Sequence, residues 1–183
     1  MARDVLGVDP GRRGAVVLLR GSRVVVASAW RPSTRNGVGG FRVRLSTGEQ
    51  TWVESPFEIG RWLSLRLRGH ALGAWLLAVE ESVVVRNPAV SIKVARAAGE
   101  LAGPLSAYAL GSTSWVRASE WRRTILGLSP WTGRKRAKAA AVDFVPGLVV
   151  GLAEVTEILG SPEDVADAAG IALWRGSRTE EEP

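Results

Sequence analysis

Apolar residues along this chain follow two patterns, short unbroken runs and longer stretches with a helical period. Residues 4–9, 14–19 and 23–30 are rich in Val and Leu and are separated by turns that contain glycine. This pattern predicts three strands of an antiparallel meander. Residues 74–80 form a further unbroken run, which predicts a strand covered on both faces.

The other segments alternate between loops and predicted helices. The apolar period predicts five helices. The first begins at Glu54-Ser55-Pro56 and is about fifteen residues long, and the second runs from Asn87-Pro88 to about Leu101. The other three are expected at 118–126, from Arg134 to about Val145, and from Glu163 to Trp174. Gly103-Pro104 is expected to end the second of these helices, and a short strand is expected at 105–110. Residues 31–54 are loop-like, with a short strand as an alternative at 41–45, and residues 146–160 fit a strand or a helix.

Hairpin-linked strands followed by alternating helices and strands predict an α/β fold with a mixed five-stranded sheet. The meander supplies three antiparallel strands, and crossover connections place the two later strands parallel to the first. A length of 183 residues, 46% of them hydrophobic, suits one domain with a core of its own, which we place at residues 1–175. The polar, acidic residues 176–183 are expected to be a disordered tail.

The composition limits the kinds of partner and of metal site that the protein can have. The net charge is +6, which favours a polyanionic partner. Lysine is rare and arginine supplies nearly all the positive charge, which suits phosphate contacts but also follows from a GC-rich genome. The absence of cysteine excludes disulfides and cysteine-ligated zinc, and the single histidine, His70, is expected near a helix end at the surface. Without an apolar run of roughly 18 residues or a secretory signal, the protein is expected to be cytoplasmic.

Two acidic residues stand at the ends of predicted buried strands. Asp9 ends the first strand, before Pro10-Gly11, and Glu80 ends the strand at 74–80. If these strands are parallel neighbours, both carboxylates emerge at the edge where open α/β sheets bind ligands. Glu81 would point to the opposite face from Glu80, and we prefer Glu80. A turn aspartate without further function is the alternative for Asp9.

Two more acids lie in the last predicted helix. Asp164 and Asp167 are three residues apart and therefore share one face of that helix. Ser161 and Asp164 have the spacing of a capping box, which would explain Asp164 without any catalytic role. Capping does not explain Asp167, which lies among alanines that allow a helix to approach a sheet closely.

Converging carboxylates without cysteine or histidine make a hard-oxygen site suited to Mg²⁺ or Mn²⁺. Their mutual repulsion makes such a cluster unfavourable without cations. Two ions roughly 4 Å apart can activate a water and stabilise the leaving oxygen of a phosphodiester. In a basic protein, nucleic acid is the natural phosphodiester.

A set of motifs spread along the chain carries a family pattern. The motifs are Gly7-Val8-Asp9-Pro10-Gly11, Ala78-Val79-Glu80, Arg86-Asn87 ahead of Lys93 and Gly99, and Asp164-Val165-Ala166-Asp167-Ala168. Together they resemble the RuvC-type Holliday junction resolvases, over residues 4 to about 174. The resemblance implies an RNase H-like fold, a homodimer, and symmetric cleavage of four-way DNA junctions with two Mg²⁺ (or Mn²⁺) ions per active site. It assigns catalysis and metal binding to Asp9, Glu80, Asp164 and Asp167.

The chain departs from the family at one position and leaves another open. Val83 stands where family members carry an aromatic residue that contacts bases at the crossover, and Trp131 is a candidate replacement, with burial in the core as the alternative. The family also has a lysine near the phosphate. Lys138 fits that place best by its spacing to Val145, and Lys135 is the rival.

Basic residues near these motifs are candidate phosphate contacts, with a solvated helix face as the alternative. The candidates for DNA binding are Arg12, Arg13, Arg86, Asn87, Trp131, Arg134, Lys135 and Arg136. Arg122-Arg123 adds positive charge in the second half of the chain. The helix that carries Val90, Val94 and Ala97 is expected to be core, although helices of this kind also form the dimer in the family.

The resemblance therefore implies a magnesium-dependent endodeoxyribonuclease of DNA recombination and repair, in a bacterial cell or a phage-infected host. Asp9, Glu80, Asp164 and Asp167 would bind the metal, and Lys138 would stabilise charge on the scissile phosphate. One alternative is an RNase H-like nuclease that acts on RNA or an RNA–DNA hybrid. Another is a junction-binding protein that does not cut.

Overall fold

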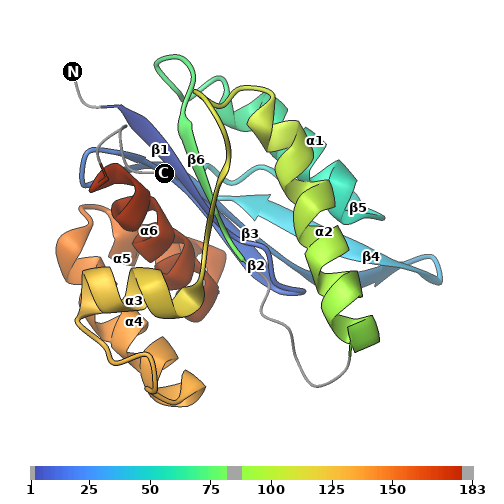
Figure 1. The fold of residues 1–183 in the computed structure, drawn as a ribbon. Helices are drawn as coiled ribbons and strands as arrows, with labels where there is room; N and C mark the ends of the chain where they lie inside the picture. Colours follow the sequence, from blue (N-terminus) through green and yellow to red (C-terminus); the bar gives the residue numbers. More distant parts are fainter. Residues whose placement is uncertain (1–2, 82–87, 179–183) are drawn as a thin grey trace.

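The computed structural model describes residues 3–81 and 88–178, which form a seven-stranded mixed sheet with helices on both faces (Figure 1). The strand order is β5-β4-β3-β2-β1-β6-β7. The strands are β1 (Asp4–Asp9), β2 (Gly14–Arg20), β3 (Arg23–Arg35), β4 (Val38–Leu45), β5 (Gln50–Val53), β6 (Leu76–Glu80) and β7 (Ser114–Val116). The helices are α1 (Pro56–Leu67), α2 (Pro88–Ser106), α3 (Ala118–Leu126), α4 (Arg134–Leu148), α5 (Leu152–Leu159) and α6 (Pro162–Gly176).

The sheet confirms the predicted α/β class and its mixed strand directions. β1, β2 and β3 form the antiparallel meander, and β6 and β7 continue the sheet as parallel strands on the other side of β1. The predicted count of five strands is wrong, because β3 continues to Arg35 and β4 and β5 extend the sheet through the loop-like segment 31–54. The alternative of a short strand at 41–45 is confirmed, since these residues belong to β4. Arginines alternate with Phe41, Val43 and Leu45 on β4, so only one face of this extension is apolar.

Helices cover the two faces of the sheet separately (Figure 1). α1 and α2 pack on one face, where Leu63, Leu67 and Leu105 join a core with Trp30 and Val43. α3 to α6 pack on the other face around Trp121 and the alanines of α6. No helix within the described residues is long and apolar enough to cross a membrane.

Close packing of α6 on β1 depends on Gly7. A Cβ atom at Gly7 would overlap the backbone of α6 at Ala168 and Ala172, so only glycine allows this approach. The short side chains of α6 that face the sheet, Ala168, Ala169 and Ala172, complete the contact. The packing places the first turns of α6 beside the end of β1, where Asp9 lies.

Two predicted element boundaries are wrong. α2 does not end at Gly103-Pro104 but continues to Ser106, because Leu101 and the fully buried Leu105 extend its apolar stripe across the proline. The strand predicted at 105–110 is therefore absent, and β7 lies further along the chain. The ambiguous stretch 146–160 contains the end of α4 and the whole of α5. His70 is exposed just after α1, as predicted.

Candidate active site

Two strands and one helix bring four carboxylates to the same edge of the sheet. β1 and β6 are parallel neighbours, with Val8 opposite Val79, so Asp9 and Glu80 leave the sheet side by side. Asp164 and Asp167 come from the first turns of α6, which packs on β1. All four residues line one open hollow of about 1050 Å³. Asp167 is almost completely buried, whereas the other three are partly exposed.

Glu80 and Glu81 both line this hollow, but Glu80 is the glutamate whose charge acts on Asp9 and Asp167. The indole Nε1 of Trp121 donates a hydrogen bond of 3.0 Å to Oε2 of Glu80. Glu81 instead forms an exposed ion pair with Arg117, at 3.1 Å. Glu80, the glutamate preferred from the sequence, is therefore the one beside Asp9.

The capping-box interpretation of Asp164 is wrong. Ser161 makes no side-chain cap hydrogen bond at the start of α6. Asp164 instead lies 3.7 Å from the ammonium of Lys138 on α4. Its carboxylate therefore pairs with a charge on another helix.

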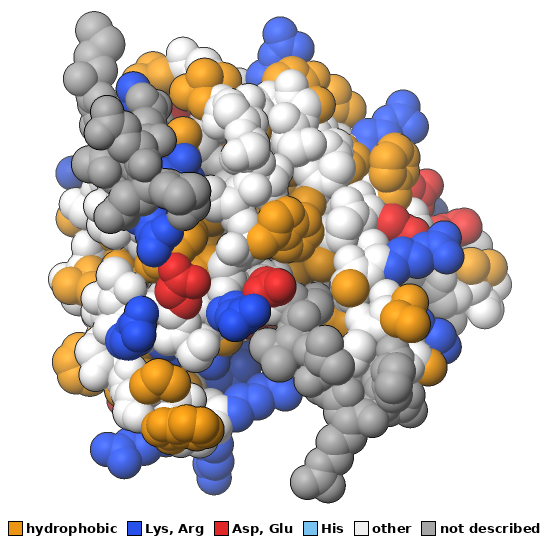
Figure 2. All heavy atoms as spheres, viewed as in Figure 1, with side chains coloured by type: hydrophobic (Ala, Val, Ile, Leu, Met, Phe, Trp, Pro, Cys, Tyr) orange, Lys and Arg blue, Asp and Glu red, His pale blue; other side chains and the backbone are white. Residues whose placement is uncertain are grey.

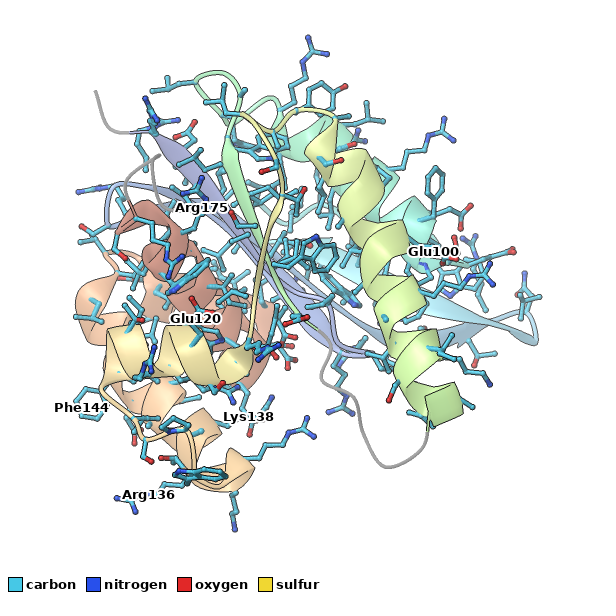
Figure 3. All side chains as sticks on the ribbon, viewed as in Figure 1. Glu100, Glu120, Arg136, Lys138, Phe144 and Arg175 are labelled. Carbon is cyan, nitrogen blue, oxygen red and sulfur yellow. The ribbon has the colours of Figure 1, made fainter. Side chains whose placement is uncertain are left out.

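Two cations lie among the acids. The Lys138 ammonium lies 3.2 Å from Glu163 and 3.9 Å from Asp167. Figure 3 shows Lys138 on the side of α4 toward the centre of the molecule, whereas Arg136 of the same helix points outward. Arg122 of α3 donates to Oδ2 of Asp167 at 3.0 Å, and this pair is largely buried. Both cations offset repulsion among the carboxylates.

The pKa values of Asp9, Asp164 and Asp167 show that their ionised forms are unfavourable in this environment. Burial raises the pKa of Asp9 well above its ordinary value, and the neighbouring charges of Glu80, Asp167 and Asp164 raise it further. Burial raises the pKa of Asp167 to about 6 although Arg122 opposes the shift, and burial also raises the pKa of Asp164. Partial burial lowers the pKa of Lys138, but the carboxylates around it outweigh this effect and the pKa is raised. Further positive charge in this hollow would therefore be favourable.

The donor set suits a hard divalent cation. Oδ1 of Asp167 is buried and has no hydrogen-bond partner within the described residues, so it is available to a cation. Carboxylate oxygens are the ligands that Mg²⁺ and Mn²⁺ prefer. Within residues 3–81 and 88–178, no three acidic or histidine side chains are arranged so that they could hold a metal ion together, and Arg122 and Lys138 provide the counter-charge in this arrangement.

The predicted DNA-binding residues lie at different places around the hollow. Arg12, Arg13 and Arg134 are exposed and line it. Lys135 and Arg136 are exposed on the first turn of α4, and neither is among the described residues that line the hollow. On the face shown in Figure 2, basic side chains gather at the lower left, over α3 and α4. Arg86, Asn87 and Val83 lie outside the described residues.

Trp131 lies on the surface, so burial in the core is wrong for this tryptophan. Its side chain is 92% exposed, in the loop between α3 and α4. Its backbone N–H donates to Oγ of Ser129, and Thr132 donates to the carbonyl of Ser129, which forms a tight turn. Ser129, Pro130 and Thr132 line the hollow and Trp131 does not, so this loop forms part of the rim with an exposed tryptophan on it.

The expected core role of Val90 and Val94 is also wrong, because both are exposed in the N-terminal half of α2.

Sequence reasoning missed the two residues of α3 that hold the acids in place, Trp121 and Arg122. The apolar pattern of 118–126 predicted that Trp121 is buried, and it is. Its bond to Glu80 follows from the docking of α3 against Gly170 of α6, where a Cβ atom would overlap the Trp121 ring. That contact leaves no signal in the local pattern.

Comparison with known proteins gives similarity in structure only. A scan against protein-family models and a search of curated proteins find no match. Among solved structures, the chain is similar to Thermus thermophilus RuvC in complex with a Holliday junction substrate, with 18% identity, 94% of this chain and 92% of that chain covered, and a TM-score of 0.49. It is also similar to a second Thermus thermophilus RuvC structure, with 19% identity, coverage of 93% and 92%, and a TM-score of 0.45.

Proposed function

We propose that this protein is a metal-dependent endonuclease that cuts four-way DNA junctions by symmetric phosphodiester hydrolysis, with residues 1–175 as its nuclease domain. The observation that carries the proposal is the convergence of Asp9, Glu80, Asp164 and Asp167 at one sheet edge, where their charges are costly without cations. Lys138, the family's candidate lysine, lies against the same acids. The basic rim around the hollow suits a phosphate backbone.

The four carboxylates would hold two Mg²⁺ or Mn²⁺ ions in this hollow. Such ions supply an activated water and charge stabilisation on the leaving oxygen of a phosphodiester. Trp121 orients Glu80, and Arg122 orients Asp167, so both are positioning residues. Lys138 is the group best placed to donate to an oxygen of the scissile phosphate.

The rim would hold the DNA. Arg12, Arg13 and Arg134 lie where phosphates on either side of the cut would pass, and Lys135 and Arg136 extend the positive charge along α4. Trp131 would stack on an unpaired base at the crossover, because its ring is exposed at the rim and every base has a face on which an aromatic ring can stack.

Two active sites are needed for paired nicks, so the working form would be a homodimer. The N-terminal half of α2 exposes Val90 and Val94, which are four residues apart and share one face of the helix that a second copy could cover. Light scattering in the concentration range of the cleavage assay tests this part of the proposal.

The test is cleavage of a synthetic four-way junction with labelled arms, in Mg²⁺ and in Mn²⁺, with the products mapped on both strands. We expect paired nicks at symmetric positions. Asp9→Asn should bind the junction without cutting it. Asp143→Asn, which removes an exposed carboxylate of α4 that does not line the hollow, is the matched control and should cut normally.

Two other outcomes would replace the proposal. Faster cleavage of structured RNA or an RNA–DNA hybrid than of the junction would indicate an RNase H-like nuclease with another substrate. Tight junction binding with no cleavage across Mg²⁺ and Mn²⁺ titrations would indicate a binding protein whose acids have lost catalysis.

A further inference from the structure

The part of the sheet that the sequence pattern did not predict carries a row of arginines on one face. Strand pairing places Arg31 directly opposite Arg42, Ala29 opposite Arg44, and Arg35 opposite Val38. Because opposite residues share a face and alternate residues along a strand share a face, these four arginines lie on the same side of β3 and β4. We call Arg31, Arg35, Arg42 and Arg44 the arginine face.

The arginine face is the uncovered side of this part of the sheet. The residues between the arginines, among them Trp30, Val43 and Leu45, point to the other side and pack in the core beneath α1 and α2. On the arginine side the core contains Ala27 and Ala29 of β3 and does not extend further along the strand. All four arginines are exposed, and none forms an ion pair within residues 3–81 and 88–178.

Folding alone does not explain this arrangement. Like charges directly opposite on neighbouring strands are destabilising, as for Arg31 and Arg42. The sequence offers no local relief, because residues 10–48 contain no Asp or Glu. The next acid, Glu49, pairs with Arg66 of α1 at 2.7 Å rather than with the arginine face. A charged surface of one sign is expected where a partner of opposite charge binds.

Polar and aromatic groups on the neighbouring strand complete the surface. Trp52 pairs with Arg42 and Gln50 with Arg44, so both share the arginine face. They line a shallow hollow of about 430 Å³ together with Arg35 and Arg42. The Trp52 ring lies over Gly40, where a Cβ atom would meet ring carbon Cζ2 at 2.6 Å. Gly40 thus makes space for a flat ring on the open face of the sheet.

The arginine face is continuous with the candidate active site. Gly14 pairs with Trp30, so Arg31 follows directly beside the turn that carries Arg12 and Arg13. The Trp30 indole donates to the carbonyl of Gly11 at 3.1 Å and fixes that turn against β3. Arg31 lines the large hollow with the acids, and its cross-strand partner Arg42 lines the smaller hollow.

We propose that the arginine face binds the phosphate backbone of a duplex DNA arm that leads into the active site. The identity of the ligand rests on the proposed function, because the surface adjoins the acids that would cut the same DNA. Guanidinium groups on a flat, open sheet face suit successive phosphates and carry no base specificity.

The experiment compares two triple variants that lose the same charge. Arg35→Gln, Arg42→Gln and Arg44→Gln together neutralise the arginine face but leave Arg31 beside the active site. Arg61→Gln, Arg66→Gln and Arg68→Gln together neutralise three exposed arginines of or next to α1, on the opposite side of the sheet. Affinity for a four-way junction and for a duplex of the arm sequence is measured by fluorescence anisotropy in EDTA, over a range of salt concentrations. Cleavage at saturating junction is measured separately.

We expect the arginine-face variant to bind both DNAs at least about 10-fold more weakly, and the magnitude of its salt slope to fall by about 2–3, because each lost phosphate contact removes about 0.9. Its cleavage rate at saturation should match that of the unaltered protein. Its thermal midpoint should be the same or higher, because the repulsion between Arg31 and Arg42 is removed. The α1 variant should keep the original affinity and slope. Equal losses in both variants, or none in the arginine-face variant, would overturn this inference while leaving the nuclease proposal intact. Unaltered protein that binds through the arginine face but cuts no DNA would overturn only the nuclease proposal.

Discussion

Ionisation of the Asp9 carboxyl is unfavourable in the folded protein, because burial and three neighbouring acids all raise its pKa. A raised folded-state pKa means that the free energy of unfolding falls as pH rises from the ordinary aspartate value of about 3.9 through the folded value. Asp9→Asn cannot ionise and avoids that loss. In EDTA we therefore expect the variant to melt several degrees above the unaltered protein at pH 8 and level with it near pH 4. Thermal unfolding across this range checks the difference, and a less stable Asn variant at pH 8 would contradict it.

Arg122 makes ionisation of Asp167 less unfavourable. Its guanidinium opposes the effect of burial on the pKa of Asp167, which is about 6. In Arg122→Gln that pKa should rise further, and the variant should lose about 2 kcal/mol of unfolding free energy at pH 8. At pH 5, where Asp167 is mostly protonated in both proteins, the loss should be smaller. Urea unfolding at the two pH values measures it. Arg123→Gln, at the exposed neighbour, is the control and should show no pH-dependent loss.

Trp131 provides a residue whose proposed role is separable from folding. Because its side chain is 92% exposed, Trp131→Ala should change the unfolding free energy by less than about 0.5 kcal/mol. Stacking on a base contributes about 1–3 kcal/mol, so junction affinity should fall roughly 5- to 150-fold. Trp131→Phe should retain most of the affinity. If Trp131→Ala binds a four-way junction as well as the unaltered protein does, base stacking at the rim is excluded.

At the scale of elements, the site depends on how closely α6 approaches β1. A methyl group at Gly7 would overlap the α6 backbone at Ala168. Gly7→Ala should therefore cost about 1–3 kcal/mol of unfolding free energy and displace Asp167 from Asp9, with loss of cleavage. Gly39→Ala is the matched control, because Gly39 lies in the same sheet and a Cβ atom there would meet nothing within 4 Å. Urea unfolding and the junction assay on both variants distinguish a specific effect at Gly7 from a general cost of alanine in a strand.

The elements that could be predicted are those whose pattern is local. The unbroken runs of β1 and β6 and the amphipathic period of α3 are visible in the sequence, and the structure has all three. β4 is predicted only in part, as the alternative of a short strand at 41–45, because arginines and glycines occupy its open face and only Val43 and Leu45 indicate its buried side. The end of α2 was misplaced because burial of Leu105 outweighs the proline before it. In both cases, packing against a distant segment decided the local conformation.

At the scale of the whole molecule, convergence of the four acids could be predicted because strand order and helix periodicity each constrain it. Parallel pairing of β1 with β6 places Asp9 beside Glu80, and the spacing of Asp164 and Asp167 places both on one helix face. The cations around them could not be predicted in the same way. Arg122 reaches Asp167 only because Trp121 packs against Gly170, a contact between α3 and α6 that no local pattern records.

The whole molecule should also respond to divalent cations in a pH-dependent way. A cation that binds only the folded protein adds RT ln(1 + [L]/Kd) to its stability, about 2.7 kcal/mol at 100 times Kd. For a protein of this size, that corresponds to a rise in the melting temperature of about 5–11 °C. The gain should be larger at pH 8 than at pH 5.5, because at the lower pH a cation must displace protons from Asp9 and from Asp167, whose pKa is about 6.

Thermal unfolding in MgCl₂ at both pH values, against NaCl of equal ionic strength, measures this gain. The double variant Asp9→Asn with Asp167→Asn removes two of the four candidate ligands and should lose most of the Mg²⁺-dependent shift. Asp143→Asn should retain it, because this exposed carboxylate lies outside the hollow. An equal shift in the double variant would mean that the cations bind elsewhere on the protein. The acids would then be an ordinary charged cluster, balanced by Arg122 and Lys138 alone.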